Sequence, residues 1–230
     1  PEQQPPAESS GSDMRAIMQS SLRSRHLTLT VGMIALTVMT ASFVDFQFKT
    51  VSRQAYPVGA DLTAFLGRFY GRMSLISLLV QVTLAPRLIR WFGVGSSLLV
   101  LPLILAGGAL TMVLLPGLLA GMLMRGGDFA LKYSQDKTSR ELLFLPIPLA
   151  LKKRTKVFID LFVDRWARGL AGGLLLLVTA VLHLDLRGIA VVTLVLGAIW
   201  LVLALLMRRA YVNSFRQALA RREIDLKDLR

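Results

Sequence analysis

The uncharged run GIAVVTLVLGAIWLVLALLM, residues 188–207, decides the fold class of this chain. It is as long as the roughly 20 apolar residues that an α-helix needs to cross the hydrocarbon core of a bilayer. A surface helix of a soluble protein would instead show a polar face. Arg187 precedes the run and Arg208 follows it. The run therefore predicts one membrane-spanning helix.

Five further apolar runs extend this prediction along the chain. The overall composition, 54% hydrophobic residues, decides little, because soluble domains average about 45–50%. The gathering of the apolar residues into long runs decides more, and Pro86 and Pro116 end two of these runs. We predict an all-α membrane protein with six transmembrane helices, at residues 27–46, 62–84, 96–115, 118–133, 157–182 and 188–207.

Basic residues are divided unequally between the two ends of these predicted helices. Nineteen lysines and arginines flank one side, whereas Lys49, Arg53 and Arg187 flank the other. Basic residues mark the cytoplasmic side of a membrane protein, so both termini are predicted to be cytoplasmic. The net charge of +13 then reflects membrane topology, and no nucleic acid is expected as a partner.

Three regions follow from this topology. Residues 1–24 begin with a stretch rich in Pro, Glu, Gln and Ser, a composition that cannot build a core, and are predicted to be a disordered linker and cytoplasmic lead-in. Residues 25–212 form the six-helix transmembrane domain, and residues 213–230 a cytoplasmic tail leading to a further domain. Within the longest loop, residues 138–145 are expected to form a short interfacial helix, with a plain loop as the alternative.

The short, uncharged gap between the third and fourth predicted helices allows a division into two triplets of opposite topology. Transporter halves are often built in this way, as inverted 3+3 repeats. Two Gly-x-x-x-Gly pairs, Gly67 with Gly71 and Gly169 with Gly173, indicate close helix packing. These features agree with half of a transporter bundle.

Charged residues inside the predicted helices are the candidate functional residues, because ionisable groups in a bilayer are costly and usually functional. Arg68 and Arg72 have no carboxylate on their own helix, and with Arg125 they are the candidates for binding an anionic substrate. The remaining charges either pair to hold helices together or act as gates. They are Asp45 with Lys49, Asp128 with Lys132, and Asp164 with Arg168, each at i, i+4, together with Asp160.

The expected depths of these charges place them in two layers, one at each mouth of a central site. Asp45 and Arg68 belong to the outer layer. Such layers would suit gates that close alternately. The inner layer holds Asp128, Lys132, Asp160, Asp164 and Arg168.

Several classes of site are missing from the sequence. The chain has no cysteine, which excludes disulfides and thiolate metal sites. It has no P-loop, dinucleotide-binding, zinc-protease or serine-hydrolase motif. His26 and His183 lie at helix ends and are expected to be interfacial. We therefore expect no enzyme activity, catalytic residue, metal or cofactor.

Five segments together resemble a known family. They are FVDFQFK (43–49), FLGRFYG (65–71), PRLIRWFGVG (86–95), the stretch from KYS to ELLFLP (132–146), and KVFID (156–160) with Asp164-Arg165. The set is similar to the C-terminal half of the ATP/ADP translocase (nucleotide transporter) family of bacteria and plastids. The resemblance implies a major-facilitator fold with twelve helices in two halves. Within that family it looks closer to bacterial members that are fused to cytoplasmic HEAT-type repeats.

The resemblance implies ATP binding and ATP/ADP antiport across a bacterial inner membrane. The expected partners are the lipid bilayer, the nucleotide or another anionic small molecule, the N-terminal six-helix half of the same protein, and a HEAT-type domain. The surplus of cations over carboxylates in the charged helices also suits phosphate groups. The alternative is a non-transporting membrane anchor or sensor coupled to a cytoplasmic domain.

Overall fold

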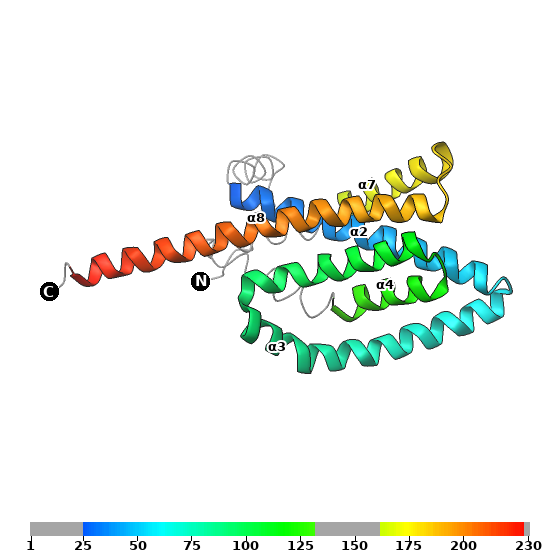
Figure 1. Cartoon of the computed structure of the whole chain (residues 1–230), viewed down its shortest axis with the longest axis horizontal. Helices are drawn as coiled ribbons and strands as arrows, with labels where there is room; N and C mark the ends of the chain where they lie inside the picture. The colour runs from blue at the N-terminus through cyan, green and yellow to red at the C-terminus, as the bar shows by residue number, and fades with distance from the viewer. Residues whose placement is uncertain (1–24, 132–161, 228–230) are drawn as a thin grey trace, which may run out of the picture.

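The computed structural model describes residues 25–131 and 162–227, and every regular element in these residues is helical (Figure 1). The predicted all-α class is confirmed for this part of the chain. The elements are α2 (Arg25–Ala55), α3 (Gly59–Leu114), α4 (Leu118–Leu131), α7 (Asp164–Leu176), the π-helical turn η3 (Leu177–Val181) and α8 (Leu186–Lys227).

The helices run back and forth between two ends of an elongated bundle (Figure 1). The connections from α2 to α3, from α3 to α4 and from η3 to α8 lie at one end. The bend of α3 and the start of α2 lie at the other end, from which α8 extends beyond the bundle. A chain that crosses a lipid bilayer several times must place successive connections at alternate ends in this way.

The second and third predicted helices are two arms of one helix, α3, which runs from Gly59 to Leu114. Figure 1 shows α3 doubling back, with α4 lying between its two arms. Pro86, Gly93 and Gly95 lie between the arms in the sequence. A proline inside a helix removes one hydrogen bond and kinks the axis, but it does not always end the helix. The predicted end of a helix at Pro86 was therefore wrong, because α3 bends in this region and continues.

Helix α2 continues to Ala55, beyond the predicted end at Phe46. The extra turns are helical because Phe48 and Val51 are buried against α3 and α4. As a result Asp45 and Lys49 lie inside the helix, not at its end. Likewise, α8 reaches Lys227, so most of the predicted tail continues the last helix. Residues 132–161, with Lys132, Asp160 and the predicted interfacial helix, lie outside the described residues.

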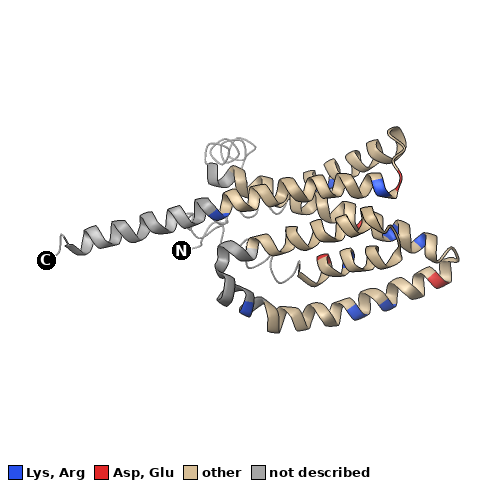
Figure 2. Ribbon diagram, viewed as in Figure 1, with Lys and Arg blue, Asp and Glu red and all other residues tan. Residues whose placement is uncertain are grey.

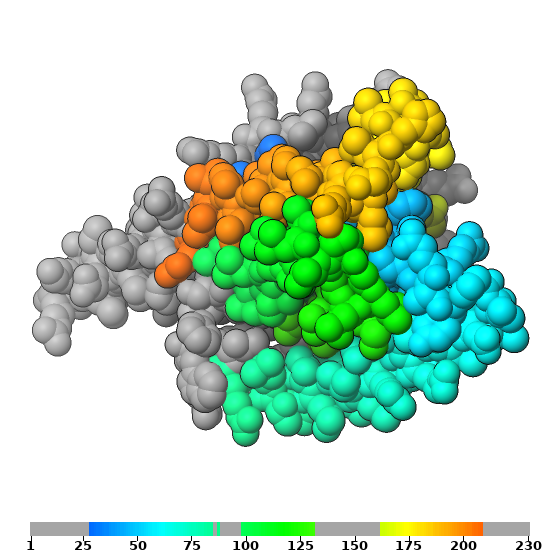
Figure 3. Space-filling model, turned by 45° about the vertical axis from the view of Figure 1, so that its right-hand side comes forward, coloured from blue at the N-terminus to red at the C-terminus, as the bar shows by residue number. Residues whose placement is uncertain are grey.

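The core lies between α2, α4, α8 and the second arm of α3. Leu105, Met112, Met124 and Met207 are fully buried in its largest cluster. A second cluster joins Phe43 of α2 to η3 and α8, and a third is aromatic, with Phe48 and Phe69 rings 4.5 Å apart. Figure 3 shows α8, α4 and the second arm of α3 forming one continuous surface. The charged helices are thus held on a rigid apolar scaffold.

Two described helices are long and apolar enough to cross a membrane, Thr28–Ala55 and Leu186–Arg208; Leu98–Leu114 is apolar but shorter. The first arm of α3 carries Arg68 and Arg72, which lower its hydropathy. Figure 2 shows the second arm of α3 and the middle of α8 free of charge, and many leucine and valine side chains there are exposed. These features are those of a membrane protein.

Candidate functional site

Arg125 of α4 is the centre of a charge network. Its Nη2 lies 2.9 Å from Asp45 Oδ1 on α2, and its Nη1 lies 2.7 Å from Asp128 Oδ2, one turn along α4. Asp45 is shared, because Lys49 Nζ lies 2.7 Å from its Oδ2. Two lysine or arginine side chains and two carboxylates therefore form one connected set.

Tyr70 brings α3 into this network. Its hydroxyl donates a 3.5 Å hydrogen bond to Asp45 Oδ1, and the Arg125 guanidinium lies 5.8 Å from the centre of its ring. A cation at this distance from an aromatic face is attracted by the ring quadrupole. Tyr70 is itself held by Phe129, whose ring centre is 5.8 Å away. The aromatic side chain therefore limits where the Arg125 guanidinium can move.

Burial is uneven across the network. Asp128 is only 1% exposed, whereas the side chains of Asp45 and Lys49 are 27% and 58% exposed. A buried carboxylate is costly without a partner, so Arg125 is needed by Asp128. The Nε of Arg125 is buried and has no hydrogen-bond partner among the described residues. The two terminal nitrogens, Nη1 and Nη2, are held by Asp128 and Asp45.

A cavity of about 430 Å³ opens beside the network. Its charged lining consists of the cations of Lys49, Arg125 and Arg168 and the carboxylate of Asp45. The lining comes from α2, α3, α4 and α7, so the cavity depends on the packing of four elements. The other lining residues are Val38, Ala41, Ser42 and Tyr70. Asp128 and Asp164, which pair with Arg125 and Arg168, are not among the lining residues, so the cavity surface itself presents more cations than carboxylates to an anionic ligand.

Arg168 reaches this cavity from α7. Its Nε and Nη2 donate hydrogen bonds to Asp164, at 2.7 Å to Oδ2 and 3.3 Å to Oδ1. The Arg168 side chain is 62% exposed and the Asp164 side chain 26% exposed. The Asp164–Arg168 pair therefore lies at the edge of the cavity and not in the core.

Arg68 and Arg72, the other predicted substrate residues, lie elsewhere. Both are exposed on the first arm of α3, and Arg68 Nε donates to the Ala64 carbonyl of the same helix at 3.2 Å. Neither lines the cavity beside Arg125. The structure therefore brings together Arg125, Asp45, Lys49 and Arg168, but not these two arginines.

Three comparisons with known proteins bear on this site. No family model matches the chain, and no solved structure matches it. The chain is 22% identical over 231 residues to ADP,ATP carrier protein 1 of Chlamydia pneumoniae. It is similar to part of a carrier. The match covers 90% of this chain but 44% of that protein, so the chain spans less than half the length of its relative.

This likeness to a carrier agrees with the family resemblance read from the sequence. The residues quoted for that resemblance include Asp45, Lys49 and Tyr70, in FVDFQFK and FLGRFYG. In the structure these three meet at the Arg125 network. The segments that resemble a carrier therefore contribute directly to the candidate site.

The predicted separation of the charges into two layers does not hold for Asp45 and Asp128. Both bind the same guanidinium, that of Arg125. Arg168, assigned to the inner layer, lines the same cavity as Asp45. The prediction placed Asp45 at a helix end, but α2 continues for more than two turns past it, so Asp45 lies at the depth of Arg125.

The two Gly-x-x-x-Gly pairs do not pack helices together within the described residues. A Cβ atom added at Gly67, Gly71, Gly169 or Gly173 would meet nothing within 4 Å. The close approaches occur instead at Gly108, near Met124, and at Gly121, near Val51. The two glycine pairs, one on α3 and one on α7, thus face open space.

Tyr70 is the site residue that sequence reasoning missed. It was quoted within FLGRFYG, but an aromatic residue in an apolar helix resembles any core aromatic. Its neighbours one turn away, Leu66 and Ser74, are uncharged, so the spacing does not pair Tyr70 with a charged residue. Only its contact with Asp45, 25 residues earlier in the chain, shows its role.

Proposed function

We propose that this chain is half of a secondary transporter that exchanges nucleotides, such as ATP and ADP, by alternating access. The observation that carries the proposal is the Arg125 site, where the guanidinium lines a cavity together with Lys49, Arg168 and one carboxylate, that of Asp45. A phosphate group accepts two parallel hydrogen bonds from arginine. The cavity therefore suits the charged end of an organic phosphate.

Binding of a phosphate would compete with Asp45. The carboxylate of Asp45 holds both Arg125 and Lys49, and a phosphate brings more negative charge to the same donors. When the anion binds, Asp45 is released and the contact between α2 and α4 is weakened. When the anion leaves, the ion pairs re-form. The site thus has two alternative sets of contacts, as a substrate-dependent conformational change requires.

The rest of the architecture in this proposal rests on topology and resemblance. The six helices form half of a major-facilitator-type bundle, with an inverted 3+3 repeat, in a bacterial inner membrane with both termini cytoplasmic. Arg68, Arg72 and the open glycine pairs face the N-terminal six-helix half of the same protein, and a HEAT-type domain follows α8. The greater length of the Chlamydia pneumoniae relative supports a second half.

The function is tested by exchange of radiolabelled ATP and ADP in proteoliposomes that contain the full-length protein. Arg125→Gln is expected to abolish exchange, and Arg68→Ala with Arg72→Ala to reduce it if those arginines face the cavity between halves. Arg187→Gln is the matched control, since Arg187 is an exposed arginine at the start of α8. Exchange retained in Arg125→Gln would refute the site.

A membrane anchor or sensor is the second candidate, and one observation favours it. Asp45, Asp128 and Asp164 are each ion-paired in the described residues, as a purely structural core requires. The absence of any nucleotide exchange by folded wild-type protein would reject the nucleotide assignment and favour this second function.

A further inference from the structure

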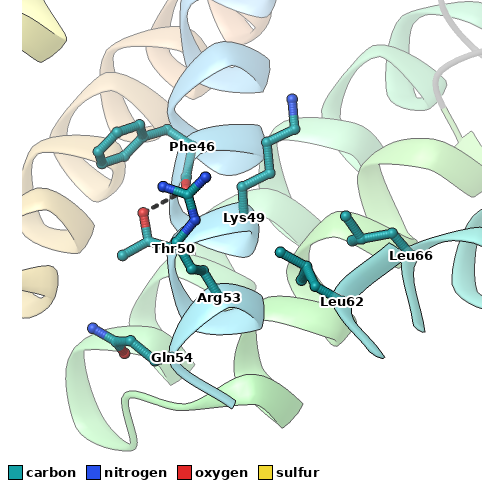
Figure 4. A pocket seen from close by; sticks show the side chains of 7 residues that line it. All are labelled: Phe46, Lys49, Thr50, Arg53, Gln54, Leu62 and Leu66. Atoms are coloured by element: carbon teal, nitrogen blue, oxygen red, sulfur yellow. Dashed lines mark hydrogen bonds between the residues drawn. The ribbon is translucent and has the colours of Figure 1, made fainter. Parts of the chain in front are cut away.

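A second cavity, of about 670 Å³, lies between the end of α2 and the start of α3 (Figure 4). Its volume falls within the roughly 300–1,000 Å³ of small-molecule sites. The lining residues are Phe46, Lys49, Thr50, Arg53, Gln54, Leu62 and Leu66. This cavity shares Lys49 with the Arg125 site and otherwise has its own residues.

The lining contains two cations on α2 and apolar side chains on either side of them in the view of Figure 4. Lys49 and Arg53 lie one turn apart on α2, and no carboxylate is among the lining residues. Figure 4 shows Leu62 and Leu66 of α3 opposite these α2 side chains, with Phe46 on the α2 side. A ligand that fills the cavity would therefore meet cations at one point and hydrocarbon at another.

Arg53 is the charged group available to such a ligand. Within the part of the chain that the structure describes, it has no ion pair or side-chain hydrogen bond, whereas Lys49 is paired with Asp45. Two cations at i, i+4 repel each other and weaken a helix. An anion bound between Lys49 and Arg53 would remove that repulsion.

The polar side chains do not supply a competing negative group. The Thr50 hydroxyl already donates to the Phe46 carbonyl at 2.9 Å, and Gln54 offers a neutral amide. The cavity can thus hold an anion by its two cations while the apolar side chains take an uncharged part of the same molecule.

We propose that this cavity binds an amphipathic phosphate, with the phosphate group on Lys49 and Arg53 and its apolar part against Leu62 and Leu66. Two sources share this chemistry, an anionic phospholipid and a nucleotide. The proposal does not depend on transport, because binding here is an equilibrium property of a cavity that excludes Arg125.

The test is native mass spectrometry of the full-length protein in detergent, titrated with four probes. Dioctanoyl phosphatidylglycerol and AMP each carry a phosphate and an apolar or aromatic group. Dioctanoyl phosphatidylcholine has the same chains with a zwitterionic headgroup, and inorganic phosphate has no apolar part. We expect phosphatidylglycerol or AMP to bind more tightly than the last two.

Arg53→Gln is expected to weaken that binding about tenfold, the usual cost of one charge-assisted hydrogen bond. Arg187→Gln, a change at another exposed arginine, is expected to leave it unchanged. Leu62→Ala is expected to weaken binding of the amphipathic probe but to leave binding of inorganic phosphate unchanged. Phosphatidylglycerol binding that depends on Arg53 identifies a lipid, and AMP binding lost in Arg53→Gln but kept in Arg125→Gln identifies a nucleotide.

Three results would overturn the proposal. They are equal binding of phosphatidylglycerol and phosphatidylcholine without AMP binding, equal loss in Arg53→Gln and Arg187→Gln, and inorganic phosphate binding as tightly as either amphipathic probe. Because no exchange is measured, a failure here leaves the transport proposal standing, and a failure of exchange leaves this site standing.

Discussion

Arg125 Nη2 and Asp45 Oδ1 lie 2.9 Å apart, although 80 residues separate them in the chain. This contact joins α4 to α2 at a cavity, and the same Asp45 also holds Lys49. A carboxylate that pairs with two cations at a cavity lowers the attraction of the cavity for an anion. The predictions below begin from this relationship.

Asp45→Asn is expected to tighten nucleotide binding and to slow exchange. The amide keeps the shape of the side chain but removes the negative charge that occupies Arg125 and Lys49. We expect KM for ADP uptake to fall about tenfold and the maximal rate to fall with it, since release of the anion is slower. The measurement is the concentration dependence of exchange in proteoliposomes.

Asp61→Asn is the matched control for that experiment. Asp61 is an exposed carboxylate in the first turn of α3 and does not line the cavity. Its replacement should leave both kinetic constants unchanged. Identical kinetics in Asp45→Asn and wild type would show that Asp45 does not compete with the substrate.

Arg125→Gln is expected to destabilise the fold by about 3 kcal/mol, because it removes an ion-pair partner of the buried Asp128. The double variant Arg125→Gln with Asp128→Asn should recover much of this loss, since the buried charge is then absent. Thermal unfolding in detergent gives both values as a double-mutant cycle. If the two substitutions prove additive, the Arg125–Asp128 pair is not coupled.

Gly121→Ala is expected to reduce stability by about 1–3 kcal/mol through overpacking. An added Cβ would lie 2.6 Å from Val51 Cγ2 and 3.6 Å from Phe48 Cα, where α4 crosses α2. Gly71→Ala is the comparison, because a Cβ there meets nothing within 4 Å. Gly71→Ala should therefore leave the stability of this six-helix part unchanged.

The Gly71 comparison also tests the proposed second half. If another helical body covers the face of Gly71, the alanine variant should lower the melting temperature of the full-length protein while leaving the isolated six-helix part, where it can be purified folded, unaffected. Equal behaviour in both forms would indicate that this face meets lipid.

Gln47→Leu is expected to lower stability by about 1 kcal/mol. Gln47 is completely buried, and its Nε2 donates a 2.6 Å hydrogen bond to Thr193 Oγ1, which links α2 to α8. Thr193→Val should cost a similar amount. Urea or thermal unfolding of the two single variants and the double variant would show the coupling, and simple additivity would argue against it.

How much of the site was predictable depends on how local each contact is. The pairs Asp45–Lys49 and Asp164–Arg168 form within one helix at i, i+4, at 2.7 Å each, and such pairs can be read from spacing alone. Arg125 and Asp128 at i, i+3 belong to the same class. Arg125 was predicted to bind substrate, which stays a prediction, and its ion pair with Asp45 was not foreseen.

Arg68 and Arg72 show the limit of the same reasoning. Their spacing places both on one face of a helix, and the structure agrees that they share an exposed face. Which face of a helix meets its neighbours is set by packing, here by Phe65 and Phe69 turning toward Phe48. The aromatic side chains bury one side of the first arm of α3 and leave the arginines on the other.

The amino-acid sequence by itself determined the helical class, the apolar runs of α2 and α8, and the ion pairs within single helices, because each depends on residues within a few turns. Only the tertiary structure decided that α3 bends without breaking, that Asp45 meets Arg125 and Tyr70, and that the Gly67 and Gly71 face stays open. These features depend on how separate helices pack, and packing energy comes from contacts between distant residues, which no local pattern records.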